Sequence, residues 1–325
     1  MKIDVHNHFF PLPYVKELAK RKHSPTVEQD HLDRTLIHYA GDYNIVEDAH
    51  TTPEVRLREM DRCGIDMQVL SLTTPGLEMI ESVSEAVALA RVVNDAFAAI
   101  AEQYPERFSA FAALPLRDIG SAIDELERAV TTLGLKGGTL FSNVPGTSLD
   151  SRNFWPLFEK ATQLDVPLFI HPTTPTTPNV FNEYRLVPLL GFPFDTTLAI
   201  TRLVFSGVLE AYPTLKLILA HTGGTMPYLA ERVDNGYRAY TECQKHITRL
   251  PSEYLKLTYL DTVSFHPPAL ICACMFMGVE KLVLGSDYPH QIGNLQQSVM
   301  SIEELDFPGK EAILEENAGR LLKIL

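Results

Sequence analysis

Short apolar runs alternate with longer amphipathic stretches along most of this chain. The runs are almost continuously apolar, which is typical of strands that are covered on both faces. The stretches between them repeat apolar residues every three or four positions, which is typical of helices that bury one side. Strands that alternate with helices form a parallel sheet. Seven such runs lie within residues 65–72, 108–114, 135–141, 167–172, 215–221, 255–261 and 280–287, and an eighth strand is expected at residues 3–8, where Ile3 and Val5 alternate with polar residues.

Eight strand–helix units in 325 residues favour an α/β fold of the (β/α)8, TIM-like barrel type. No Gly-x-Gly-x-x-Gly motif follows a predicted strand, so the usual signature of a dinucleotide-binding open sheet is missing. The sequence has no internal repeat and no Gly/Ser-rich linker, so we predict one domain over residues 1–325. The apolar pattern weakens only between residues 11 and 53. We predict that this segment is irregular and forms a lid inserted after the first strand.

Histidines and one aspartate occupy the ends of several predicted strands. In barrels of this type the reactive side chains lie at the carboxyl ends of the strands. The residues found there are His6, His8, His171, His221 and Asp287. His6 and His8 are two positions apart, so their side chains leave the first strand by the same face. Histidines scattered through a core or over a surface have no reason to share one rim, so we predict that these side chains converge.

This residue set suits a divalent cation. Three imidazoles and a carboxylate, from His6, His8, His171 and Asp287, are ligands typical of zinc, and they also hold manganese, iron or cobalt. His221 is a fifth ligand or an unliganded acid or base, since imidazole exchanges protons near neutral pH. The Thr-Gly-Gly sequence after it indicates a tight turn. Taken singly, His171 also fits a hydrogen-bonded residue before a turn, and Asp287 also fits a residue that opens one.

Composition narrows the possible partners and compartment. The chain has 28 Lys and Arg against 41 Asp and Glu, a formal net charge of −13. This charge disfavours nucleic acid and anionic membranes as partners, because phosphate binding needs a basic surface. No apolar run approaches the ~20 residues of a membrane span, and the first residues lack the pattern of an export signal. The four cysteines form no Cys-x-x-Cys pair, so we expect reduced thiols and a cytoplasmic protein.

Five motifs follow one another along the predicted elements: DVHNHFFP, PLFIHP, LAHTGG, ERVDN and LVLGSDYP. With these motifs the chain resembles the decarboxylase-type branch of the amidohydrolase superfamily, which includes the aminocarboxymuconate semialdehyde, γ-resorcylate and 6-methylsalicylate decarboxylases. The resemblance implies a metal-dependent, non-oxidative decarboxylase of a small aromatic or unsaturated carboxylic acid, such as a hydroxybenzoate. It also implies one metal ion and a homodimer or higher homo-oligomer. The metal ligands that it implies are His6, His8, His171 and Asp287.

The same resemblance implies roles for three residues. It gives Asp287 the transfer of a proton at the reacting carbon and His221 a place beside the metal. It gives Arg232 a contact with substrate carboxylate across a dimer interface, whereas the residues alone also allow an ion pair with Glu231, Asp234 or another residue of the helix. The semialdehyde decarboxylase carries a further arginine in its lid, but residues 42–47 contain none. This departure favours a substrate with a single carboxylate.

Two other functions are open. The first is hydrolysis of a lactone, amide or ester at the same site, because a bound metal lowers the pKa of water to about 7. Release of CO2 without incorporation of water distinguishes decarboxylation from hydrolysis. The second is a barrel without catalysis that serves as a binding or scaffold protein. The intact set of candidate ligands argues against it, and metal analysis of the purified protein would decide.

Overall fold

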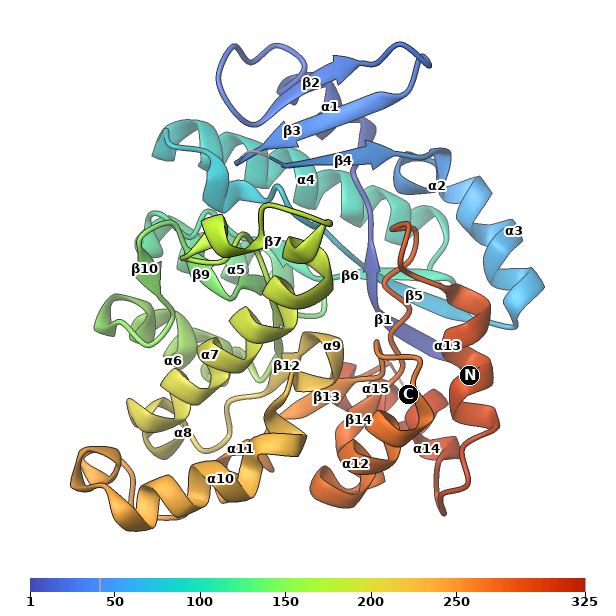
Figure 1. Cartoon of the computed structure of the whole chain (residues 1–325). Helices are drawn as coiled ribbons and strands as arrows, with labels where there is room; N and C mark the ends of the chain where they lie inside the picture. Colours follow the sequence, from blue (N-terminus) through green and yellow to red (C-terminus); the bar gives the residue numbers. More distant parts are fainter. Residues whose placement is uncertain (41, 325) are drawn as a thin grey trace.

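Parallel strands occupy the centre of the molecule, and helices lie around them (Figure 1). The computed structural model describes residues 1–40 and 42–324. Its parallel strands form one sheet in the order β1-β5-β6 and another in the order β14-β13-β12-β11-β8-β7, so the predicted α/β fold with parallel sheets is confirmed. The bounds are β1 Ile3–His8, β5 Met67–Ser71, β6 Phe108–Ala110, β7 Ala112–Ala113, β8 Gly138–Phe141, β11 Leu168–His171, β12 Leu217–Leu219, β13 Tyr259–Asp261 and β14 Leu282–Val283.

Backbone hydrogen bonds connect the two sheets at both ends. Strands β6 and β7 are parts of one predicted strand, separated only by Phe111. The N–H of Phe111 donates to the carbonyl of Leu70 in the first sheet, and β7 then pairs with β8 in the second. The N–H of Val5 in β1 donates to the carbonyl of Leu284, directly after β14, over 2.9 Å. The first and last parallel strands therefore lie next to each other.

The helices begin and end at the residues expected of such elements. Helix α3 has Pro53 in its first turn and ends at Gly64, whose φ of 69° lies in the left-handed region. The Ser82 hydroxyl caps α4 by accepting the N–H of Glu85. The bounds are α1 Leu12–Leu18, α2 Asp48–Thr51, α3 Pro53–Cys63, α4 Val83–Gln103, α5 Ile119–Thr131, α6 Trp155–Leu164, α7 Phe192–Phe205, α8 Val208–Ala211, α9 Ala220–Gly223, α10 Met226–Ala239, α11 Pro251–Leu255, α12 Pro267–Met277, α13 Leu295–Glu303, α14 Glu311–Leu314 and α15 Glu316–Leu322.

The buried apolar side chains form two clusters. The larger one includes residues from the strands and from the surrounding helices. The smaller one is built from Ile3 and Val5 of β1, their neighbours on other parallel strands, and Leu321 and Leu322 of α15. Helix α15 therefore contributes to the core beside the first residues of β1. The histidines lie at the other ends of the strands, the carboxyl ends.

The segment from residue 11 to residue 53 differs from the prediction. It holds an antiparallel sheet in the order β2-β3-β4, which lies at the top of Figure 1 between α1 and α2. The prediction of an irregular segment is therefore wrong. Few of the strand residues are buried, so the alternation is weak, and the strands depend on pairing with each other. The bounds are β2 Thr26–Gln29, β3 Thr35–Tyr39 and β4 Asp42–Val46.

One described helical stretch, Val187–Phe205, is long and apolar enough to cross a membrane by length and composition alone. It consists of a π-helical turn, Val187–Gly191, and α7. One side of α7 contributes Ile200 and Leu203 to the larger core cluster, as a core helix does. Its other side exposes apolar side chains, among them Phe194 and Leu198.

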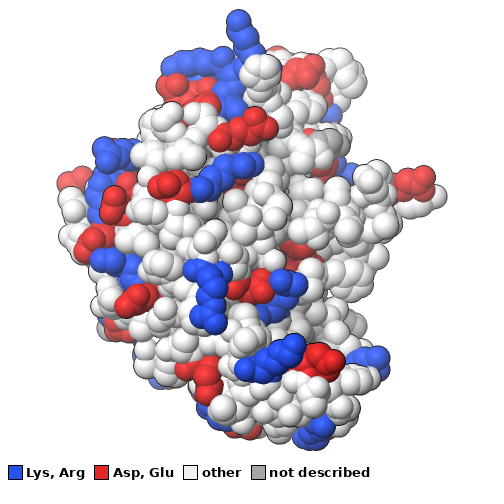
Figure 2. All heavy atoms as spheres, turned by 90° about the vertical axis from the view of Figure 1, so that its left-hand side faces the viewer, with Lys and Arg blue, Asp and Glu red and all other residues white. Residues whose placement is uncertain are grey.

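Charged side chains of both signs are interspersed over the face of the molecule seen in Figure 2. Lys and Arg side chains lie beside Asp and Glu side chains on this face. The ion pairs of the chain include that of Arg202 with Asp150. No continuous basic area appears on this face. Of the cysteines, only Cys274 is buried, and all four are free thiols.

Candidate metal centre

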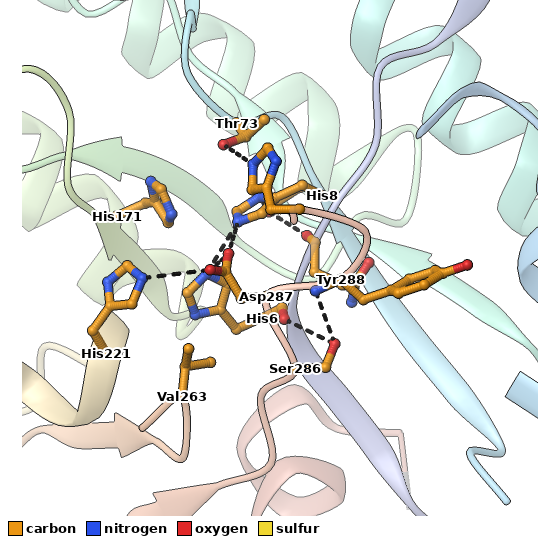
Figure 3. Close-up of polar contacts among 12 residues, drawn as sticks. His6, His8, Thr73, His171, His221, Val263, Ser286, Asp287 and Tyr288 are labelled. Atoms are coloured by element: carbon orange, nitrogen blue, oxygen red, sulfur yellow. Dashed lines mark hydrogen bonds and ion pairs between the residues drawn. The ribbon is translucent and has the colours of Figure 1, made fainter. Parts of the chain in front are cut away.

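The strand ends bring the five predicted site residues together (Figure 3). The Nε2 atoms of His6 and His8 are 3.0 Å apart, and they lie 3.3 and 3.0 Å from Oδ1 of Asp287. His171 and His221 complete the cluster. One ligand atom from each of His6, His171, His221 and Asp287 lies within 4.8 Å of the others. The rings of His8 and His171 are 4.7 Å apart between centroids.

Asp261, the last residue of β13, orients two members of this cluster. Its carboxylate is fully buried and accepts the Nδ1–H of His6. It also accepts the backbone N–H groups of His221, Thr222 and Val263, over 2.9 to 3.1 Å. One carboxylate thus sets both the ring of His6 and the turn that carries His221. Our sequence-based selection missed Asp261, although the signal was the one that found Asp287: an acidic residue at a strand end.

The other two proposed histidine ligands, His171 and His8, have the same tautomer as His6, with the proton on Nδ1. Nδ1 of His171 lies 2.7 Å from the carbonyl of Pro172, so it donates. Nδ1 of His8 lies 3.3 Å from Oγ of Ser71, whose hydroxyl donates to the carbonyl of Asn7 and leaves its oxygen as the acceptor. With the proton on Nδ1, the neutral ring carries a lone pair on Nε2. Three such lone pairs therefore converge on Asp287.

These atoms fit a divalent cation. Lone pairs 3.0 Å apart repel each other unless a positive charge lies between them, and Nε2 of His171 is buried without a hydrogen-bond partner. Adjacent ligands of an ion with bonds of about 2.1 Å lie about 3.0 to 3.4 Å apart. The spacings of 3.0 to 3.3 Å among His6, His8 and Asp287 match this range. Three imidazole nitrogens and a carboxylate are the donor set expected for such a site.

The electrostatics also call for a positive charge here. Burial opposes protonation of His6, but Asp261 and then Asp287 outweigh it and raise the pKa of His6 to about 10, so a proton competes with a metal ion for Nε2 of this ring. Burial instead holds the pKa of His8 and of His171 well below the ordinary value, so both rings are neutral. Burial opposes the charge of Asp287 as well, yet its contacts with His221, His6 and His8 hold the pKa of this carboxyl well below the usual range. The cluster is therefore arranged around one cation.

The backbone is strained where it presents two of these side chains. His221 and Thr222 have φ values of 54° and 56°, and Asp287 has a φ of 55°. Residues other than glycine rarely adopt this left-handed region, and they do so where the surroundings determine the conformation. Gly223 and Gly224 follow with φ values of 70° and 66°, so the predicted tight turn is confirmed.

Two further histidines lie beside the cluster. His50 is buried, and its Nδ1 accepts the N–H of Glu47. Its Nε2 lies 3.4 Å from Nδ1 of His290, whose Nε2 lies 3.1 Å from Oγ1 of Thr73. The ring of His290 is 4.7 Å from that of His8. Our sequence-based selection of site residues includes neither His290 nor His50. Nothing in the local sequence around either residue indicates this contact.

Two cavities meet at Asp287. The larger has a volume of about 580 Å³ and mostly apolar walls, which include Pro188, Leu189, Pro193, Val263, Phe265, Pro268, Ala269 and Ile292 beside His221. The smaller has a volume of about 380 Å³ and lies against β4. Its walls combine apolar residues such as Ile45 and Pro289 with more polar and charged residues than the larger cavity has, namely Tyr43, Asn44, Glu47, His50, Arg185, His290 and Gln291. A substrate bound at Asp287 would therefore have chemically different surroundings on its two sides.

Arg232 is the predicted site residue that the structure does not bring to this centre. It is exposed on α10 and lines neither cavity. The alternative of an ion pair within the chain is wrong for the two predicted partners. Glu231 pairs with Arg238 over 3.0 Å, and Asp234 accepts hydrogen bonds from the backbone and hydroxyl of Ser252.

Replacement of Asp261 by asparagine is expected to weaken metal binding by about 10- to 100-fold, the usual cost of losing the group that orients a histidine ligand. An amide cannot accept at both positions, so one –NH2 would face His6 or the turn at His221. Titration against a competing chelator would measure the change in dissociation constant. Asp61→Asn, at an exposed residue paired with Arg107, is the control. Equal metal affinity of Asp261→Asn and wild type would contradict this role.

Comparison with known proteins places the chain in a family. The amidohydrolase family profile Amidohydro_2 matches residues 3–324. A 2-amino-3-carboxymuconate-6-semialdehyde decarboxylase of Dictyostelium discoideum is 32% identical over 99% of this chain and 91% of the relative. A 6-methylsalicylic acid decarboxylase of Penicillium expansum is 30% identical over 89% of this chain and 85% of that protein.

A solved structure agrees with these matches. The dihydroxybenzoic acid decarboxylase of Polaromonas sp. JS666, crystallised with manganese and the inhibitor 2-nitroresorcinol, is 27% identical. It superposes with a TM-score of 0.85 and covers 99% of this chain and 97% of its own. Its cation and inhibitor belong to that protein. The match over nearly the whole chain, together with the geometry of the strand ends, shows that this protein is a member of the amidohydrolase family.

Proposed function

We propose that this chain is a metal-dependent decarboxylase, a carbon–carbon lyase that acts on a small aromatic or unsaturated carboxylic acid. The observation that carries this proposal is the convergence of three Nε2 lone pairs and one carboxylate where two cavities meet. The relatives named above are decarboxylases of acids of this kind. The proposed ligands of one divalent cation are His6, His8, His171 and Asp287.

When bound, the cation supplies a Lewis acid for a carboxylate or neighbouring hydroxyl oxygen of the substrate. Nitrogen and carboxylate donors suit both zinc and manganese, so the donor set supports either ion. We propose zinc as the resident metal because three imidazoles and a carboxylate are typical of zinc sites.

The side chains of this protein supply the proton. Loss of CO2 leaves the electron pair of the broken C–C bond on carbon, and that carbon must gain a proton. We propose that Asp287, which lines both cavities, delivers it. Because the pKa of Asp287 is held low, it rests as a carboxylate and must receive the proton from a neighbour. His221, with Nε2 3.8 Å from Oδ2 of Asp287, is the proposed source.

We also propose that the strands close into a (β/α)8 barrel and that residues 11–53 act as a lid. The hydrogen bonds Val5–Leu284 and Phe111–Leu70 support closure of the ring. The position of β4 beside the smaller cavity supports the lid. The single domain over residues 1–325 and the cytoplasmic location stay predictions.

A homodimer or higher homo-oligomer is part of the proposal. The exposed apolar side chains of the helical stretch 187–205 and of α10, among them Leu190, Phe194, Leu198 and Tyr228, support a contact with another copy. Such a contact would give exposed Arg232, also on α10, a route to the site of the neighbouring subunit.

Arg232→Ala is then expected to raise KM by about tenfold with little change in kcat, because a charge-assisted hydrogen bond to substrate carboxylate is lost. Steady-state kinetics at matched oligomeric state, checked by sedimentation, would measure this. Arg238→Ala, at the exposed partner of Glu231 on the same helix, is the matched control. An unchanged KM for Arg232→Ala would remove this residue from the site.

The proposed activity is tested by incubating metal-loaded protein with hydroxybenzoates and small lactones while CO2 and acid release are both recorded. We expect CO2 from at least one hydroxybenzoate, loss of activity with a chelator, and recovery with zinc or manganese. Acid release from a lactone with uptake of ¹⁸O from labelled water, and no CO2, would favour the hydrolase. Failure to bind a stoichiometric divalent metal would favour the non-catalytic barrel.

A further inference from the structure

The smaller cavity contains a cationic side chain, whereas the larger cavity has none among its described lining residues. Among residues 1–40 and 42–324, Arg185 is the only Lys or Arg that lines either cavity. It belongs to the segment between β11 and α7, far in sequence from β4. Asp287 lines the same cavity as Arg185. A ligand in this cavity therefore meets the proposed metal ligand and proton donor on one side and a guanidinium on another.

The guanidinium of Arg185 contacts Asp42 and Tyr43 of β4, and some of its N–H donors have no partner among the described residues. Nη1 of Arg185 donates to Oδ1 of Asp42 over 2.5 Å, and its Cζ lies 5.1 Å from the ring centroid of Tyr43. Within the described part of the chain, Nε and Nη2 of Arg185 donate to no partner. Arginine presents its donors as a planar fork that matches a carboxylate in a bidentate manner. The Asp42 contact leaves part of this fork free.

The backbone of this segment is strained at the same place. Tyr184 and Arg185 both have left-handed φ values, 57° and 56°. Two consecutive bulky residues in this region are costly, and they persist where surrounding contacts determine them. Arg185, the second of these residues, contacts Asp42 and Tyr43 of β4. The local structure thus positions the guanidinium at the cavity.

From this arrangement we propose that Arg185 binds a second carboxylate of the substrate, so that the enzyme prefers small aromatic dicarboxylic acids to monocarboxylic ones. The inference rests on the proposed function and narrows its substrate class. One carboxylate would lie at Asp287 and be lost, and the other would lie at Arg185. The absence of arginine from residues 42–47 favoured a single carboxylate, but Arg185 supplies a cation to this cavity from a different segment.

A purely structural role for Arg185 makes a different prediction. If the ion pair between Arg185 and Asp42 only holds β4 against the segment after β11, removal of either residue should change ligand binding in the same direction. If Arg185 binds an anion, the two losses have opposite effects. Arg185→Gln removes the cation, whereas Asp42→Asn removes the carboxylate that competes for it while an acceptor oxygen is kept.

The test is calorimetric binding of isophthalate and benzoate to the zinc-loaded full-length protein. We expect wild type to bind isophthalate at least about tenfold more tightly than benzoate. Arg185→Gln should bind both equally, Arg185→Lys should keep part of the preference, and Asp42→Asn should increase it. Arg202→Gln is the matched control, since Arg202 is a similarly exposed arginine paired with Asp150 and lines neither cavity.

Three results would overturn the proposal: no preference for isophthalate in wild type, an unchanged preference in Arg185→Gln, or changes of the same sign in Arg185→Gln and Asp42→Asn. Thermal melts of each variant exclude loss of folding as the cause. Because binding is measured without turnover, failure of this inference is distinct from failure of the proposed activity, which CO2 release tests separately.

Discussion

The variant His171→Ala is expected to lose decarboxylase activity and to retain far less than one equivalent of metal, while its fold stays intact. Nε2 of His171 is buried without a partner in the protein, so its removal deletes a proposed metal ligand and breaks no hydrogen bond at that atom. Its Nδ1 bond to the adjacent carbonyl of Pro172 is local. Metal content by mass spectrometry, CO2 release and circular dichroism would measure the three quantities.

The control is His23→Ala, which removes an exposed histidine from the segment between α1 and β2 and should change none of them. Loss of metal binding must be distinguished from loss of folding. A variant that unfolds near the wild-type temperature but has lost metal supports the ligand role. Full metal content and full activity in His171→Ala would instead show that the proposed site is wrong.

Asp287→Asn is expected to lower kcat by about 10²- to 10⁴-fold, the range for loss of a positioned acid or base. Asparagine keeps the size and one oxygen of aspartate, but it cannot carry a proton to carbon. It also removes the negative charge that accompanies His6, His8 and His221. Single-turnover measurement of CO2 release at saturating metal would isolate the chemical step from weaker metal binding.

Asp195→Asn provides a comparison, because Asp195 is also a buried carboxylate but, among the residues that the structure describes, bonds only to Ser142 and Asn143 and lines neither cavity. It is expected to affect stability more than kcat. If Asp287→Asn holds a full equivalent of metal and its kcat stays within a few-fold of wild type, another group delivers the proton. His221 would then be the first residue to consider.

The elements of the fold and the candidate ligands are readable from local patterns. Most of the parallel strands are buried on both faces and lie in largely apolar runs, β1 alternates apolar and polar residues, and helix limits are marked by residues such as Pro53 and Gly64. Parallel strands place their carboxyl ends on one side. This is why His6, His171 and Asp287 could be grouped although they lie far apart in the chain.

The antiparallel strands β2 to β4 could not be predicted from the sequence in this way. They are short and half exposed, so what holds them is pairing with each other and contact with distant segments. The position of His50 and His290 beside the site could likewise not be predicted, because an isolated histidine is part of no periodic pattern. Their contact depends on how the segment before α3 lies against the turn after β14.

The alternation of strands and helices follows from the sequence pattern alone, and with it the common edge at which the histidines and Asp287 lie. The residues that orient and surround them are known only from the packing of distant segments: Asp261 against His6, His290 beside His8, and Arg185 in the smaller cavity. A periodic pattern reports burial within one element. Lateral contacts between elements distant in the chain depend on packing and loop paths, which no local pattern encodes.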